Sequence, residues 1–247
     1  MTEDGAVIGV VAADEVITIT IDRQHRRNAL NHDAVTALDE AVTAAVAGGA
    51  RCIVLTGAGG HFCAGADLKE LEDLAFTERL RVMLDHLTDV PVPTIAAIDG
   101  SCMGLGMQLA LACDIRIATE SARFAVPVAK LGLMVDHQTL QRLAVVLGSG
   151  AARHLVLTAE VLTAADGHRL GLVQSIGDLT AAHELALRVT TLAPLALTGS
   201  KLGLNRLERD LDDAEYTAAF SAAWASEDLA EGRLAFAERR PPRFEGR

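Results

Sequence analysis

Short apolar strands that alternate with an amphipathic helix are the feature that most constrains the fold. VITITID (16–22) is β-branched and extended, and RCIVLTG (51–57) is a short apolar run that ends at glycine. Between them, residues 31–47 carry apolar side chains at helical spacing, and Gly48 and Gly49 follow directly. Two strands joined by a helix need a crossover connection, so we expect them to lie parallel in one sheet.

The alternation continues to about residue 118 and then gives way to helices. PTIAAIDG (93–100) and CDIRIA (113–118) are predicted strands. The later predicted helices cover 140–147, 151–157, 164–170 and 180–192, with two longer segments beyond them. No linker rich in Pro, Gly or Ser divides the chain, so we expect one α/β core followed by a helical C-terminal region.

The charge balance limits the partners. Twenty-two Lys and Arg against 33 Asp and Glu give a net charge of −11, and so negative a surface argues against a nucleic-acid partner. No run approaches the roughly 18 apolar residues that a membrane-spanning helix needs. The acidic start of the chain lacks the basic and apolar regions of a signal peptide. We therefore expect a reduced, cytoplasmic, soluble protein with no membrane span.

The cysteines show no metal-binding spacing. Cys52, Cys63, Cys102 and Cys113 form no CxxC pair, and no HxxxH lies near them. A structural zinc site needs convergent ligands at recognisable spacing. We expect these cysteines to be small buried hydrophobes and predict no metal site.

Two glycine-rich turns follow predicted strands. TGAGG (56–60) and GLGMQL (104–109) both fail to complete GxGxxG, because Phe62 and Leu109 occupy the sixth positions, and a dinucleotide site is disfavoured. Turns that feed helices do present free backbone N–H groups, which can stabilise an oxyanion. Gln108 is the one polar, non-titratable side chain in the apolar segment that follows the second turn.

A basic cluster, RQHRRNAL (23–30), follows the first strand. On a chain with net charge −11 it is a local positive spot suited to a phosphate group. An ordinary solvated loop remains the alternative.

Several motifs, in this order and at this spacing, resemble the crotonase superfamily, which contains the enoyl-CoA hydratases and isomerases. They are RRNALN (26–31), IVLTGAGGHFCAGADL (53–68), PTIAAIDGSCMGLGMQLALACDIRIA (93–118), KLGL…LQRL (130–143), LTAEVLTAADGHRLGLV (157–173) and EGRLAFAERRPPRF (231–244). The resemblance covers nearly the whole chain. It implies an α/β spiral of ββα units over 1–190 and a helical trimerisation region over 191–247, in a homotrimer or dimer of trimers.

The ligand that this resemblance implies is an acyl-CoA, with no separate cofactor. Its thioester carbonyl would lie between the backbone N–H groups of Ala66 and Leu105, an oxyanion hole. Most relatives have glycine or alanine where this chain has Leu105. The coenzyme A contacts implied by the resemblance are Arg26, Arg27, Ala29, Ala64, Asp67 and Leu68.

The departures from the family pattern concern catalysis. Hydratases of the family use two glutamates, at the positions that match Gln108 and Val128. An amide does not titrate near neutral pH and valine carries no polar group, so the resemblance implies that ordinary hydration is lost or crippled. In this respect the chain is similar to actinobacterial members of the family that carry or sequester fatty acyl-CoA.

Asp136 keeps a second hypothesis open. Dienoyl-CoA isomerases and a haloaroyl-CoA dehalogenase of the superfamily have a working aspartate at this position, so the chain is also a candidate isomerase or thioester hydrolase. Alternatively, Asp136 only hydrogen-bonds Gln108 or His137 and shapes a closed pocket. A third hypothesis is a weak 2-enoyl-CoA hydratase that uses a water held by Gln108.

Overall fold

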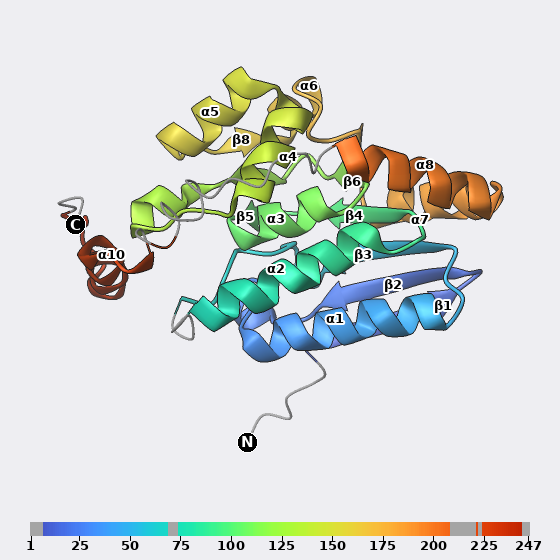
Figure 1. Cartoon of the computed structure of the whole chain (residues 1–247), viewed down its shortest axis with the longest axis horizontal. Coiled ribbons are helices and arrows are strands. Elements are labelled where there is room, and N and C mark those ends of the chain that lie inside the picture. Colours follow the sequence, from blue (N-terminus) through green and yellow to red (C-terminus); the bar gives the residue numbers. More distant parts are fainter. Residues whose placement is uncertain (1–6, 69–73, 208–220, 222–223, 244–247) are drawn as a thin grey trace.

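A six-stranded sheet forms the centre of the computed structural model, which describes residues 7–68, 74–207, 221 and 224–243 (Figure 1). The strand order is β1-β2-β3-β4-β6-β9. β1 and β2 form an antiparallel hairpin, and all later neighbours in this sheet are parallel, which confirms the predicted crossover connections. The strands are β1 (Ile8–Ala13), β2 (Val16–Ile21), β3 (Cys52–Gly57), β4 (Thr94–Ile98), β6 (Ile115–Ala118) and β9 (Ser175–Ile176).

A smaller sheet and a set of helices complete the fold. β5 (Ser101–Met103) pairs parallel with β7 (Arg123–Ala125), which pairs antiparallel with β8 (Leu162–Thr163). The helices are α1 (His32–Ala47), α2 (Leu74–Asp89), α3 (Leu105–Ala112), α4 (His137–Leu147), α5 (Ser149–Thr158), α6 (Ala164–Arg169), α7 (Leu179–Thr190), α8 (Pro194–Leu207) and α10 (Glu227–Glu238), with short 3-10 helices η1 (Gln24–Arg26) and η2 (Pro127–Leu131). α1 and α2 pack side by side in front of the sheet (Figure 1).

The middle strands β3 and β4 of the central sheet are buried on both faces. In β3, Ile53 and Leu55 belong to a large apolar core with α1, α2 and α3, whereas Cys52 and Val54 belong to a second core with Ala186 of α7. Successive side chains of a strand point to opposite faces, so a strand covered on both faces has a continuous apolar run. This double burial explains why β3 and β4 contain little polar alternation, whereas the partly exposed β2 alternates isoleucine with threonine.

The four cysteines are free and buried, as the sequence predicts. Burial raises the pKa of the Cys52, Cys63 and Cys113 thiols to about 12, and that of Cys102 well above its usual value. A thiol with so high a pKa stays protonated at neutral pH and packs as a small hydrophobe.

Side-chain caps set where several helices begin. Asn31 Oδ1 accepts a hydrogen bond from Ala34 N–H at 3.0 Å at the start of α1, which agrees with the predicted helix over residues 31–47. Asp136 caps α4, so α4 begins at His137 and the predicted start at 140 was late. Asp178 likewise starts α7 just before the predicted 180.

Two helices represent the predicted C-terminal region in the described part of the chain. α8 packs beside α2, and α10 lies at the opposite end of the molecule against η2 (Figure 1). The boundary at 190/191 stays a prediction, because residues 208–220, 222–223 and 244–247 lie outside the described residues. None of the helices within the described ranges has the length and apolar character needed to cross a membrane.

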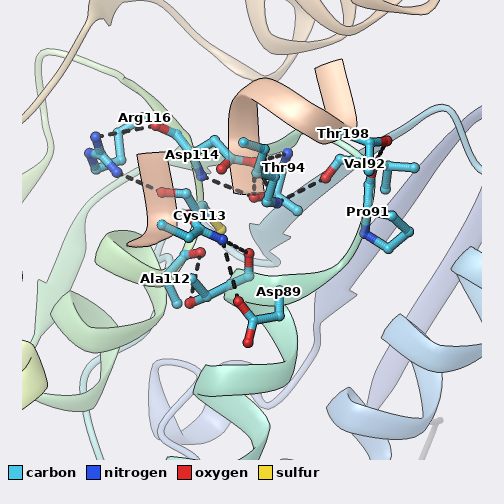
Figure 2. Close-up of polar contacts among 12 residues, drawn as sticks. Asp89, Pro91, Val92, Thr94, Ala112, Cys113, Asp114, Arg116 and Thr198 are labelled. Atoms are coloured by element: carbon cyan, nitrogen blue, oxygen red, sulfur yellow. Dashed lines mark hydrogen bonds and ion pairs between the residues drawn. The ribbon is translucent and has the colours of Figure 1, made fainter. Parts of the chain in front are cut away.

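A polar contact fixes α8 to the ends of β4 and β6 (Figure 2). Thr94 donates to Asp114 Oδ2 from its backbone N–H (2.7 Å) and from its hydroxyl (2.9 Å). Lys201 Nζ of α8 donates to the same Oδ2 at 2.7 Å and to the Val92 carbonyl at 2.9 Å. Thr198, one turn earlier on α8, donates to the Pro91 carbonyl at 2.6 Å. Lys201 is only 7% exposed, so its charge depends on these acceptors.

Replacing Lys201 with methionine tests this contact. The change leaves the Asp114 carboxylate without its cation, and because that side chain is 27% exposed, water replaces the lost partner only in part. We expect Lys201→Met to lower the free energy of unfolding by about 2 to 3 kcal/mol, measured by urea denaturation. Lys130→Met, the same substitution at an exposed lysine, should change it by less than about 0.5 kcal/mol. Equal effects of the two variants would contradict this account.

Candidate functional site

The loop after β3 is tied to β5. Cys63 N–H donates to the Ser101 carbonyl at 2.9 Å, and Met103 N–H donates to the Cys63 carbonyl at 3.0 Å. β5 leads directly through Gly104 into α3, so these bonds fix the loop relative to the N-terminus of α3.

The same loop is tied on its other side to the segment after η1. Leu30 N–H donates to the Gly65 carbonyl at 2.9 Å, and the Leu30 carbonyl accepts from Asp67 N–H at 2.8 Å. In such a parallel bridge the intervening residue, Ala66, directs its own N–H to the opposite side. Gly65 has φ +122°, a conformation that residues with a Cβ rarely adopt. Ala66 N–H makes no hydrogen bond with the described residues.

Leu105 supplies a second free N–H. It is the first residue of α3, where backbone N–H groups have no partner within the helix. Gly104 precedes it with φ +52°, and Gly104 N–H donates to the Ala125 carbonyl at 2.9 Å. The Leu105 N–H has no acceptor among the described residues.

Gly106 lets these two segments approach each other. A Cβ at this position would lie 2.2 Å from the Cys63 carbonyl oxygen and 3.1 Å from the Cys63 carbonyl carbon. Only glycine fits that gap without moving either backbone. The separation of the Ala66 and Leu105 donors therefore depends on the missing side chain of Gly106.

Ala66 and Leu105 both line one pocket of about 630 Å³ with a mainly apolar lining. α2, α3, η2 and the start of α4 supply most of its wall, and Trp224 contributes from the C-terminal region. The structure brings these predicted site residues together in the lining: Ala64, Ala66, Leu68, Leu105, Gln108, Val128 and Asp136.

A polar network lies on one wall of the pocket. Gln108 Nε2 donates to Asp136 Oδ2 at 2.8 Å and to Thr139 Oγ1 at 3.1 Å. The Thr139 hydroxyl donates to Asp136 Oδ2 at 2.6 Å, and Thr139 N–H donates to Asp136 Oδ1 at 2.9 Å. Asp136 thus accepts three hydrogen bonds. Val128 adds only apolar surface.

The predicted coenzyme A residues of the RRNAL segment lie apart from this lining. Arg26 and Arg27 are exposed, and Ala29 is buried with its carbonyl accepting from Arg23 Nη1. Asp67 is buried, 3.4 Å from Arg23 Nη2 and 3.7 Å from Arg26 Nε. The Asp67 carboxylate therefore links two arginines, and the predicted phosphate contact stays a prediction.

Asn28 is a positioning residue that the sequence reasoning missed. Its backbone is left-handed, with φ +60°. Its Nδ2 donates to the Ala58 carbonyl at 2.8 Å and to the His61 carbonyl at 2.6 Å, while its Oδ1 accepts from Arg23 N–H at 2.9 Å. Asn28 therefore holds the RRNAL turn against the loop after β3. Asparagine tolerates this conformation better than most residues, so its place in a turn was an available signal.

Comparison with known proteins agrees with this geometry. Residues 12–247 match the family model for enoyl-CoA hydratase/isomerase. The probable enoyl-CoA hydratase echA6 of Mycobacterium tuberculosis is 40% identical over 243 residues, covering 97% of this chain and all of that protein. Carnitinyl-CoA hydratase from Mycobacterium avium superposes with a TM-score of 0.84 at 36% identity, covering 98% of this chain and 99% of that one.

A methylmalonyl-CoA decarboxylase solved with 2S-carboxypropyl-CoA shares the fold at 24% identity, with a TM-score of 0.91 over 99% of this chain and 100% of that one. The chain thus belongs to the enoyl-CoA hydratase/isomerase family, and the predicted crotonase fold is confirmed.

Paired glycine-to-alanine changes test the role of Gly106. Gly106→Ala places a methyl group against the Cys63 carbonyl, so we expect a loss of about 1 to 3 kcal/mol in the free energy of unfolding. Gly199→Ala, in α8, meets no atom within 4 Å and should gain about 0.5 to 1 kcal/mol. Urea denaturation of both variants is the measurement. A stabilising Gly106→Ala would show that the approach at Cys63 is not tight.

Proposed function

We propose that this chain binds fatty acyl-CoA thioesters through Ala66 and Leu105 and has little or no hydratase activity. The observation that carries the proposal is the pair of free backbone N–H groups at one apolar pocket. Two such donors can hold one carbonyl oxygen, while the apolar lining receives an acyl chain. The similarity to a carnitinyl-CoA hydratase at 36% identity supports coenzyme A derivatives as the ligand class.

The proposed loss of hydration rests on Gln108 and Val128. Adding water across a double bond needs a group that accepts the water proton and a group that delivers a proton to carbon. At the positions where family hydratases have glutamates, this pocket offers a non-titrating amide and an aliphatic side chain. General acid–base groups contribute about 10²- to 10⁴-fold each, so two replacements remove most of the rate.

The rest of the ligand extends beyond the pocket in this proposal. Arg26 and Arg27, exposed on and after η1, are available to pair with a coenzyme A phosphate. No separate cofactor is required for binding.

A homotrimer or dimer of trimers is also proposed. The leucines Leu195, Leu202 and Leu204 of α8 are exposed and support a surface for association between subunits.

An isomerase or thioester hydrolase that uses Asp136 is the second candidate. It is favoured by the presence of this carboxylate in the same pocket as the two N–H donors. The three hydrogen bonds that Asp136 accepts weigh against it, because the carboxylate would have to give up part of these contacts to act on a ligand. Turnover of an acyl-CoA panel that disappears in Asp136→Asn would favour this candidate over binding alone.

Crotonyl-CoA hydration measures the loss of catalysis directly. We expect no detectable hydration by the native protein. The double variant Gln108→Glu/Val128→Glu should raise the rate at least about 100-fold, since it supplies two titratable groups beside the N–H pair. The two single variants are the matched controls and should stay near background. A native rate that already equals that of the double variant would refute the proposal.

Removal of one N–H donor tests the oxyanion pair. Proline is well tolerated at the first position of a helix, so Leu105→Pro deletes the N–H without ending α3. Calorimetry should show acyl-CoA binding weakened by about tenfold.

Leu105→Ala is the control, because it truncates the same side chain and keeps the N–H. We expect it to weaken binding less than the proline variant does. Equal losses in the two variants would mean that the Leu105 N–H does not hold the ligand.

A further inference from the structure

The hydrogen bonds of Gln108 fix which polar atom faces the pocket. Both amide hydrogens are engaged, one by Asp136 and one by Thr139. The amide oxygen accepts no hydrogen bond from any described residue. Oε1 is not one of the fully buried side-chain atoms that lack a hydrogen-bond partner, so it retains contact with solvent. Since Gln108 lines the pocket, its Oε1 is a hydrogen-bond acceptor open to a ligand.

This orientation cannot reverse cheaply. Turning the amide over would place Oε1 against Asp136 Oδ2, which now accepts from Nε2 at 2.8 Å, so two acceptors would meet. Thr139 donates its own hydroxyl hydrogen to the same carboxylate and therefore can only accept from Gln108. The carboxylate and the threonine together hold Gln108 as an acceptor toward the pocket.

The position of this acceptor relative to Leu105 indicates what it recognises. Gln108 follows Leu105 by one helical turn, so their Cβ atoms are about 5 to 6 Å apart on one face of α3. A carbonyl held at the Leu105 N–H places the first carbons of the acyl chain within that distance. A hydroxyl on the carbon β to the carbonyl is then within reach of Oε1.

From these contacts we propose that Gln108 makes the pocket selective for acyl thioesters with a β-hydroxyl group over saturated ones of equal length. The inference rests on the proposed thioester binding and names its ligand class. A saturated chain has no donor for Oε1, whereas a β-hydroxyl donates to it. One neutral hydrogen bond of this kind corresponds to about 3- to 10-fold in affinity.

Calorimetry with octanoyl-CoA and both enantiomers of 3-hydroxyoctanoyl-CoA tests the selectivity. For the native protein, one enantiomer should bind about 3- to 10-fold more tightly than octanoyl-CoA. In Gln108→Met, which keeps the length and removes the acceptor, this ratio should fall to about one. Gln141→Met, the same change on α4 outside the pocket lining, should keep the native ratio.

Asp136→Asn tests the positioning role. Asparagine still caps a helix, so α4 should persist, but its amide can offer Gln108 either an oxygen or a nitrogen. We expect the ratio to fall between the native value and one, and an unchanged ratio would refute the role of Asp136 in orienting Gln108. If the native protein binds octanoyl-CoA as tightly as it binds either enantiomer of 3-hydroxyoctanoyl-CoA, only the proposed selectivity is overturned. Absence of binding by all three ligands at tens of micromolar overturns the thioester proposal and this inference with it.

Discussion

The contact on which the site depends is the approach of the start of α3 to the loop after β3. Backbone hydrogen bonds hold this loop on both sides, through Cys63 to β5 and through Gly65 to Leu30. Because the bridge to Leu30 uses the groups next to Ala66 and because Leu105 begins α3, neither of their N–H groups has a partner among the described residues. Gly106 allows the two segments to meet, so the donors are placed by backbone structure and need no polar side chain.

Much of the fold could be predicted because its strongest signals are local. Buried parallel strands give apolar runs, which predicted β3, whereas β2 was predicted from its β-branched, extended pattern; the predicted strands 93–100 and 113–118 contain β4 and β6. The strands β5, β7 and β8 are too short to show a period, and β1 is mostly exposed. α2 could have been found, since its buried Leu80, Met83, Leu84 and Leu87 stand at helical spacing.

The site was predictable only as far as its motifs carried it. The resemblance identified residues that now share the pocket, and the hydrogen bond between Gln108 and Asp136 was one of the alternatives stated for Asp136. Other contacts between distant parts of the chain were not predicted. The pairing of Asp67 with Arg23 and the docking of Lys201 on Asp114 join residues far apart in sequence. Such partners depend on the folded topology, and charge or periodicity within one segment does not identify them.

In the proposed function the pocket combines the N–H donors of Ala66 and Leu105 with the Gln108 acceptor, and this arrangement suits recognition better than proton transfer. Asp136 has a structural duty, because it begins α4 and holds the Gln108 amide at the same time. Turning the Asp136 carboxylate toward a ligand would give up part of that cap, at a cost of about 1 kcal/mol, and would release Gln108 to turn over. Use of Asp136 in catalysis would therefore disturb the pocket with each turnover, whereas a carboxylate that keeps its three hydrogen bonds leaves the pocket preorganised to bind.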